Sequence, residues 1–176
     1  MLRHLIDKER QIPIDEHKMM AMSHRKGLRV MSYDDLKVGT RLETLLPGKT
    51  SGVILFFLDH HKKTKIGHWV LLFRSPEAGV VFFEPLGLAY RGLLKFTKNA
   101  DKLQKILSRS DAFVSKHPYQ RREHAETCGR HCITRWNCGH MTSKDYMALM
   151  QDPRLLPDEV VVLLTLSQDL TNLKLK

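Results

Sequence analysis

The chain has 176 residues and a mass of 20.4 kDa, which suits a single domain. Its 42% hydrophobic and 27% charged residues are typical of a globular protein and argue against a mainly disordered chain. The 29 Lys and Arg residues against 19 Asp and Glu give a net charge of +10. Such a charge favours polyanionic partners such as nucleic acid, although a basic surface that serves only solubility fits it as well.

The sequence indicates neither membrane insertion nor secretion. The longest apolar runs, 53–58 and 160–164, are much shorter than the roughly 18–20 residues that span a bilayer. The first ten residues contain no apolar stretch of signal-peptide length. All three cysteines, Cys128, Cys132 and Cys138, lie close together, and an odd, clustered set predicts reduced thiols rather than disulfides. We therefore expect an intracellular protein without a membrane partner.

The first quarter of the chain shows few regular patterns. Residues 1–27 are polar and rich in Lys, Arg, His and Met, which predicts a short helix or a loose N-terminal arm rather than a separate domain. A helical turn is expected at 33–36 and a loop at 47–50.

The middle of the chain predicts a small sheet. Short apolar runs rich in aromatic and β-branched residues predict strands at 53–58, 68–74 and 80–84. A polar turn at 60–65 separates the first two strands, and a turn with Pro and Gly at 76–79 separates the last two. The last two strands should therefore form an antiparallel hairpin.

Helical patterns dominate the second half of the chain. They predict helices at 88–96, 100–108 and 128–136, from 142–143 onward, and from Pro157 onward. A short strand is expected at 112–115. Thr127 should cap the helix that starts at Cys128, and Asp158 and Glu159 should complement the dipole of the last helix. The predicted fold class is α+β, a single domain over 1–176 with a small antiparallel or mixed sheet flanked by helices.

Cys128 is a candidate nucleophile, since the first turn of a helix favours the thiolate. Taken alone, a lone cysteine is more often buried and inert. A cysteine nucleophile works beside a histidine that a carboxylate or amide orients. His68 and Glu84 stand at the start of one hairpin strand and the end of the other, so their side chains can meet, although solvated strand ends fit the spacing equally well.

Four short motifs occur in order along the chain. They are Gly67-His68-Trp69, Phe83-Glu84-Pro85-Leu86-Gly87, Gln120 and Thr127-Cys128-Gly129-Arg130-His131-Cys132. Together they resemble the adenovirus maturation proteases (adenain-like), part of a wider group that includes the SUMO- and NEDD8-specific cysteine proteases. The likeness covers residues 50–140, and the orienting Glu84 is closer to the adenovirus type, because SUMO proteases usually have Asp there.

The resemblance implies an adenain/SUMO-protease-like cysteine protease fold and a role for each matching residue. Cys128 would be the nucleophile, His68 the general base and Glu84 its orienter. Gln120 would donate an N–H to the oxyanion beside the backbone N–H of the Cys128 region, and Trp69 would pack beside the site. The stretch 120–127 is more highly charged than in family members.

The implied activity is that of a cysteine endopeptidase that cleaves viral capsid or core precursor proteins after a small residue such as Gly. The chemistry would require no metal and no cofactor, whereas DNA and a cysteine-containing peptide would serve as activating partners. Such a protease would act inside the host cell, in the nucleus or at the site of viral assembly, and be packaged in the virion. A SUMO or ubiquitin-like-protein isopeptidase is the alternative within the same class.

Two further classes compete with a protease. Cysteine and histidine side chains lie densely enough to suggest zinc, at Cys128, His131, Cys132, Cys138 and His140. The i, i+4 spacing of the first pair and the lack of a second distant pair argue against it, so Cys132 and Cys138 are interpreted as structural thiols. A basic nucleic-acid-binding protein without catalysis is the other alternative, with charge from 62–65 and 121–122.

Overall fold

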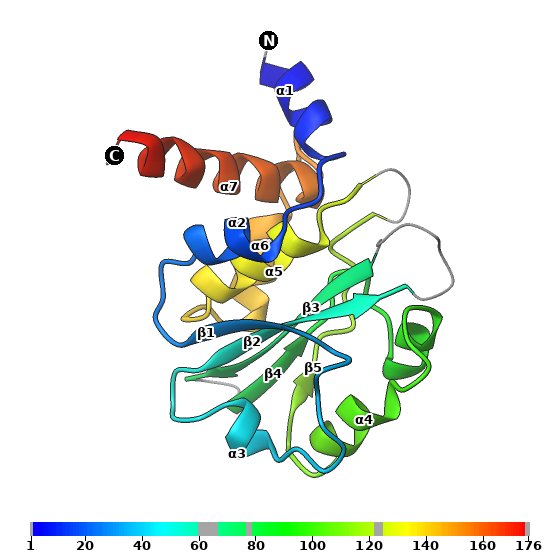
Figure 1. Cartoon of the computed structure of the whole chain (residues 1–176). Helices are drawn as coiled ribbons and strands as arrows, with labels where there is room; N and C mark the ends of the chain where they lie inside the picture. Colours follow the sequence, from blue (N-terminus) through cyan, green and yellow to red (C-terminus); the bar gives the residue numbers. More distant parts are fainter. Residues whose placement is uncertain (1, 60–66, 77–78, 122–124, 175–176) are drawn as a thin grey trace.

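The computed structural model describes residues 2–59, 67–76, 79–121 and 125–174. They form an α+β structure in which helices flank both faces of a five-stranded mixed sheet (Figure 1). The predicted fold class is therefore confirmed at the level of an α+β domain with a small mixed sheet. The predicted polar turn at 60–65 and residues 77–78 of the second turn lie outside the described residues.

The strands follow one another across the sheet in chain order. They are β1 (Leu28–Ser32), β2 (Gly52–Leu58), β3 (Gly67–Ser75), β4 (Gly79–Phe83) and β5 (Phe113–Val114). The central pairs β2–β3 and β3–β4 are antiparallel, and the two edge strands pair in parallel with their neighbours. The predicted hairpin is thus β3–β4.

The sequence did not predict β1. Only Leu28 of this strand is buried, and the other four residues are exposed or partly exposed. An edge strand lacks the continuous apolar run by which buried strands such as β2 are found in a sequence.

Helices cover the two faces of the sheet unequally (Figure 1). On one face lie α1 (Leu2–Glu9), α2 (Glu16–Ala21), α5 (Cys128–Asn137), α6 (Ser143–Met150) and α7 (Pro157–Lys174). On the other lie α3 (Leu42–Leu45), the 3-10 helix η1 (Tyr90–Lys95) and α4 (Asp101–Leu107). None of the described helices is long and apolar enough to cross a membrane.

Each face of the sheet has its own hydrophobic core because side chains alternate along the strands. Leu71 and Phe73 of β3 pack with Ile133 and Trp136 of α5, and all four are fully buried. Leu72 faces the other way, into the core beneath α4. Helix α5 packs directly on β3, which brings the start of the helix, with the predicted nucleophile, close to the strand that carries His68.

The N-terminal segment forms the short helices α1 and α2, which was one of the two expected alternatives, and it is docked on the core rather than a loose arm. Met19 and Met22 are fully buried and Ile14 is 2% exposed, all within the core around α5. Glu9 forms an ion pair with Arg130 of α5 at 2.6 Å. The three apolar side chains dock the segment, while the polar residues between them face outward and give the sequence its tail-like composition.

Candidate active site

His68 and Glu84 lie at the same end of the β3–β4 hairpin. Antiparallel pairing aligns Leu71 with Phe83, so Glu84, one residue beyond β4, comes level with Val70 and lies diagonally across from His68. The Nε2–H of His68 donates a hydrogen bond to Glu84 Oε1. Both residues are buried, His68 at 2% and Glu84 at 0% exposure. The two side chains that the hairpin was expected to bring together do meet.

The segment after β4 wraps around the Glu84 carboxylate. The backbone N–H groups of Leu86 and Leu88 both donate to it, that of Leu86 at 2.9 Å. Gly87 permits this turn, because its φ is +67° and a Cβ there would stand 2.9 Å from the backbone nitrogen of Pro118. Three donors therefore fix the orientation of the carboxylate and compensate its charge.

Cys128 is the first residue of α5 and is 6% exposed. The following residue must be small: a Cβ on Gly129 would stand 2.7 Å from Ile14 Cγ1 and 3.3 Å from Trp69 Cδ1. The glycine thus lets the first turn of α5 approach β3, where the side chains of Cys128 and His68 lie close enough for Cys128 to raise the pKa of His68. Since Nε2 of His68 faces Glu84, Nδ1 is the ring nitrogen left for the sulfur.

The charge state of His68 follows from these contacts. Burial alone lowers its pKa, but the hydrogen bonds with Cys128 and Glu84 and the negative charges of both raise the pKa of His68 from 6.5 to about 9. The ring also stacks on Phe96, with centroids 5.0 Å apart and planes at 18°. With a pKa of about 9, the imidazole carries its proton at neutral pH.

Trp69 lies beside the first turn of α5, as its Cδ1 atom near Gly129 indicates. Its ring is partly buried and packs against Phe56, with centroids 4.5 Å apart. The residue expected beside the site is therefore adjacent to the nucleophile. Ile14, which sequence analysis did not single out, lies against the same turn.

Gln120 lies close to the Glu84 turn, because its backbone N–H and that of Tyr119 both donate to Pro85 O at 2.8 Å. Its side-chain Nε2 donates to Ala125 O at 2.7 Å, within the loop that leads to Cys128. One N–H of the amide is thus occupied, and the other has no partner among the residues that the structure describes. The contacts among the described residues do not join this amide to Cys128.

A buried hydrogen-bond cluster that the sequence did not reveal lies behind the nucleophile. Asp158, at the start of α7, accepts hydrogen bonds from the Thr127 hydroxyl, from His131 Nε2 at 3.1 Å and from the Arg121 backbone N–H at 3.0 Å. Burial raises the pKa of Asp158, but the bonds from His131, Thr127 and Arg121 and the His131 charge outweigh it and lower the pKa below 3.8.

The prediction for the start of α5 changes accordingly, whereas that for the start of α7 holds. Thr127 precedes α5 but makes no side-chain cap, because its hydroxyl turns to Asp158 instead. Asp158 and Glu159 both lie in the first turn of α7, as expected, and the Asp158 carboxylate, although only 1% exposed, also accepts from Thr127 and His131. Glu159 does act at the start of α7, where its Oε2 accepts from the Leu156 N–H at 2.8 Å.

The zinc hypothesis finds no support in the placement of the candidate ligands. Cys132 is fully buried in the core, and burial, with the nearby Cys128 and Glu84 charges, raises its thiol pKa well above 9. His131 turns to Asp158. Within the described part of the chain, no three Cys, His, Asp or Glu side chains are arranged to hold a metal ion.

Comparison with known proteins identifies no relative whose site could be set beside this one. No protein-family model matches the chain, and no curated protein matches it significantly. The interpretation of the site therefore depends on its own residues.

Proposed function

We propose that the chain is a cysteine endopeptidase of the adenain-like type, with Cys128 as nucleophile, His68 as general acid–base and Glu84 as its orienter. The observation that carries this proposal is the placement of one buried imidazole between a buried carboxylate and a cysteine at a helix start. A cysteine with only a structural role would not require a buried histidine–carboxylate pair beside it. The resemblance of residues 50–140 to adenain-like proteases, and of the fold to that group, is part of the same proposal.

The proposed reaction proceeds in two steps. The Cys128 thiolate attacks the scissile carbonyl carbon, and the collapsing tetrahedral intermediate expels the amine, to which the His68 imidazolium gives its proton. A water molecule then attacks the thioester while His68 takes a proton from it, which releases the carboxylic acid and restores the thiolate and the imidazolium. Glu84 holds the ring in position and stabilises its charged form.

The negative oxygen of the intermediate needs hydrogen-bond donors close to the sulfur. The first N–H groups of α5 have no partner within the helix and point toward this region. The free N–H of Gln120 is the proposed second donor. A donor of this kind typically contributes about 3 kcal/mol to the transition state.

The proposed substrates are capsid or core precursor proteins cleaved after a small residue, Gly in particular. Non-specific DNA and an activating peptide are proposed partners, since the charge of +10 favours the former. A ubiquitin-like-protein isopeptidase is the alternative, and the two substrate classes separate in an assay. Turnover of ubiquitin-like conjugates with no hydrolysis of short peptides ending in Gly would favour the isopeptidase.

The deciding experiment is labelling with a peptide vinyl sulfone that carries Gly next to the warhead, followed by mass mapping. We expect one adduct per chain, at Cys128, and its loss in the His68→Ala variant. Cys138, which is partly exposed, serves as the internal control, and denatured protein should label all three cysteines. An adduct at Cys138 with Cys128 unmodified would overturn the proposal.

A further inference from the structure

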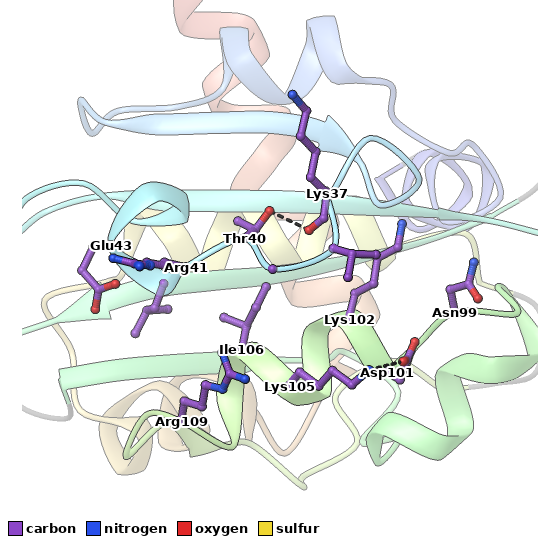
Figure 2. A pocket seen from close by; sticks show the side chains of 13 residues that line it. Lys37, Thr40, Arg41, Glu43, Asn99, Asp101, Lys102, Lys105, Ile106 and Arg109 are labelled. Atoms are coloured by element: carbon purple, nitrogen blue, oxygen red, sulfur yellow. Dashed lines mark hydrogen bonds and ion pairs between the residues drawn. The ribbon is translucent and has the colours of Figure 1, made fainter.

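A cavity of about 640 Å³ lies outside the candidate active site, between the loop after β1 and helix α4. It shares no residue with the Cys–His–Glu cluster. Figure 2 shows one wall formed by residues 37–43 and the other by α4, with Ile106 pointing from the helix toward the loop. Its volume lies within the range of about 300–1,000 Å³ that is typical of ligand sites.

The two walls are held together by buried contacts. The Tyr33 hydroxyl, at the start of the loop, donates to Asn99 O and accepts from the Leu103 N–H at 3.2 Å. On the loop side, the N–H and hydroxyl of Thr40 both bond to Lys37 O, at 3.1 and 2.7 Å. These contacts preform the cavity, which reduces the ordering that a ligand would otherwise require.

The cavity is strongly cationic. Five basic side chains line it against two carboxylates: Lys37, Arg41, Lys102, Lys105 and Arg109 against Glu43 and Asp101. The Lys105 ammonium is neutralised by Asp101 at 2.9 Å. None of the other four basic groups lies in an ion pair with a carboxylate of the described chain. Positive charge gathered at a concave site attracts an anionic ligand.

Apolar side chains lie between the charges. Leu42 and Ile106 line the cavity, and Val38 at its rim is 81% exposed. No aromatic side chain is among the described lining residues, whereas single-stranded nucleic acid is held by stacking of its bases on aromatic rings. A hollow of this size also cannot admit a duplex. Mixed cationic and aliphatic walls instead fit a short peptide.

We propose that this cavity binds an acidic peptide segment of a partner protein, with an aliphatic side chain against Ile106 and carboxylates against Arg41 and Arg109. The two arginines stand on opposite walls, so they can hold carboxylates on both sides of the aliphatic residue (Figure 2). The site is separate from the chemistry at Cys128, and its occupation requires no catalysis.

The test is fluorescence anisotropy at 50 mM salt with a fluorescein-labelled peptide of sequence Glu-Asp-Leu-Glu-Asp-Ser. The doubly reversed variant Arg41→Glu/Arg109→Glu should bind at least about tenfold more weakly than the native chain. The matched control Lys18→Glu/Lys144→Glu changes net charge equally at exposed positions on α2 and α6 and should lose less than threefold. Replacing Leu with Ser in the peptide, or Val38→Ser in the protein, should weaken binding as well. Circular dichroism checks that each variant is folded.

Three outcomes would overturn the proposal. The first is no binding of the peptide by the native protein at millimolar concentration. The second is an equal loss in the cavity variant and the control, which would mean attraction by net charge alone. The third is a 20-base-pair duplex that displaces the peptide and loses binding only in the cavity variant, which would make the cavity a nucleic-acid site.

Discussion

The His68 imidazole has a defined neighbour on each side. Glu84 accepts from its Nε2, the Cys128 side chain lies close enough to raise its pKa, and Phe96 stacks on its face. The ring can neither turn nor lose its proton easily, because both flanking groups stabilise the cation. Removing any of these contacts should therefore change either the orientation of the ring or its pKa.

Replacing the nucleophile should abolish catalysis without unfolding the protein. Cys128→Ala removes the sulfur at a helix start where alanine is well tolerated, so peptide hydrolysis should fall by at least about 10⁴-fold with unchanged circular dichroism. The control is Cys138→Ala, a cysteine of the same region outside the cluster, which should retain nearly full activity. A folded Cys128→Ala protein with near-native turnover would contradict the assigned nucleophile.

The raised pKa of His68 predicts the alkaline side of the pH profile. The imidazolium is present below its pKa of about 9 and is lost above it, so kcat/KM should decline as the pH rises through about 9. Glu84→Gln removes one of the charges that raise this pKa, and the decline should move to lower pH with a moderate loss of rate. His68→Ala should be nearly inactive at every pH.

The measurement is kcat/KM for a Gly-containing peptide from pH 5 to 10.5 in the native chain and both variants. An alkaline limb that stays at the same pH in Glu84→Gln would mean that Glu84 does not act on the histidine. An active His68→Ala variant would reverse the assignment of roles.

Among the secondary-structure elements, the buried strands were the most predictable from the sequence, and the edge strands were the least predictable. The runs at 53–58 and 68–74 became β2 and β3, because a strand buried on both faces must be apolar along its whole length. The strand expected at 112–115 is only Phe113–Val114, and the helix expected at 88–96 is a 3-10 helix. Edge strands and short helices depend on tertiary contacts that produce no hydrophobic periodicity in the sequence.

The candidate site likewise combines residues that the sequence could place with residues that it could not. The sequence could place His68 and Glu84 at the same end of a hairpin, because a hairpin is a local structure whose register follows from its turn, but it left open whether their side chains meet. Asp158 could not be placed, since it reaches Thr127 across 31 positions of the chain and no local pattern records that contact. The docking of Ile14 against Gly129 was missed for the same reason.

The start of α7 should influence the site through Asp158. Its carboxylate holds the loop at Arg121 and Thr127 and the first turn of α5 at His131. In Asp158→Asn an amide N–H would face one of these donors, so the free energy of unfolding should fall by about 1–3 kcal/mol.

The same substitution should lower kcat/KM, because the loop between Gln120 and Cys128 loses its anchor. Urea denaturation and peptide hydrolysis measure the two effects, with the exposed Asp111→Asn as control. A stability and a rate both equal to those of the control would show that this cluster supports neither the fold nor the site.

Taken as one body, the chain carries ten more basic than acidic side chains. We expect it to bind unrelated DNA duplexes with an affinity that falls steeply with salt, because phosphate contacts release counterions. A logarithmic slope of about −4 would correspond to about four or five phosphates. Titration at several salt concentrations, with cleavage followed in parallel, measures both binding and activation. No binding at 20 mM salt would remove DNA from the partners, and binding without a faster cleavage would reject it as an activator.

The positions of the two tryptophans give the protein a pair of separate optical reporters. Trp69 is partly buried beside Gly129, next to the proposed nucleophile, whereas Trp136 is fully buried, with its Nε1–H on Ser23 and the Arg25 guanidinium over its ring. Emission from Trp69 should respond when a group becomes attached to Cys128, and emission from Trp136 should change only when the core opens. In a Trp69→Phe chain the first signal disappears and the second remains. Modification of Cys128 and unfolding can therefore be followed separately by tryptophan fluorescence in one sample.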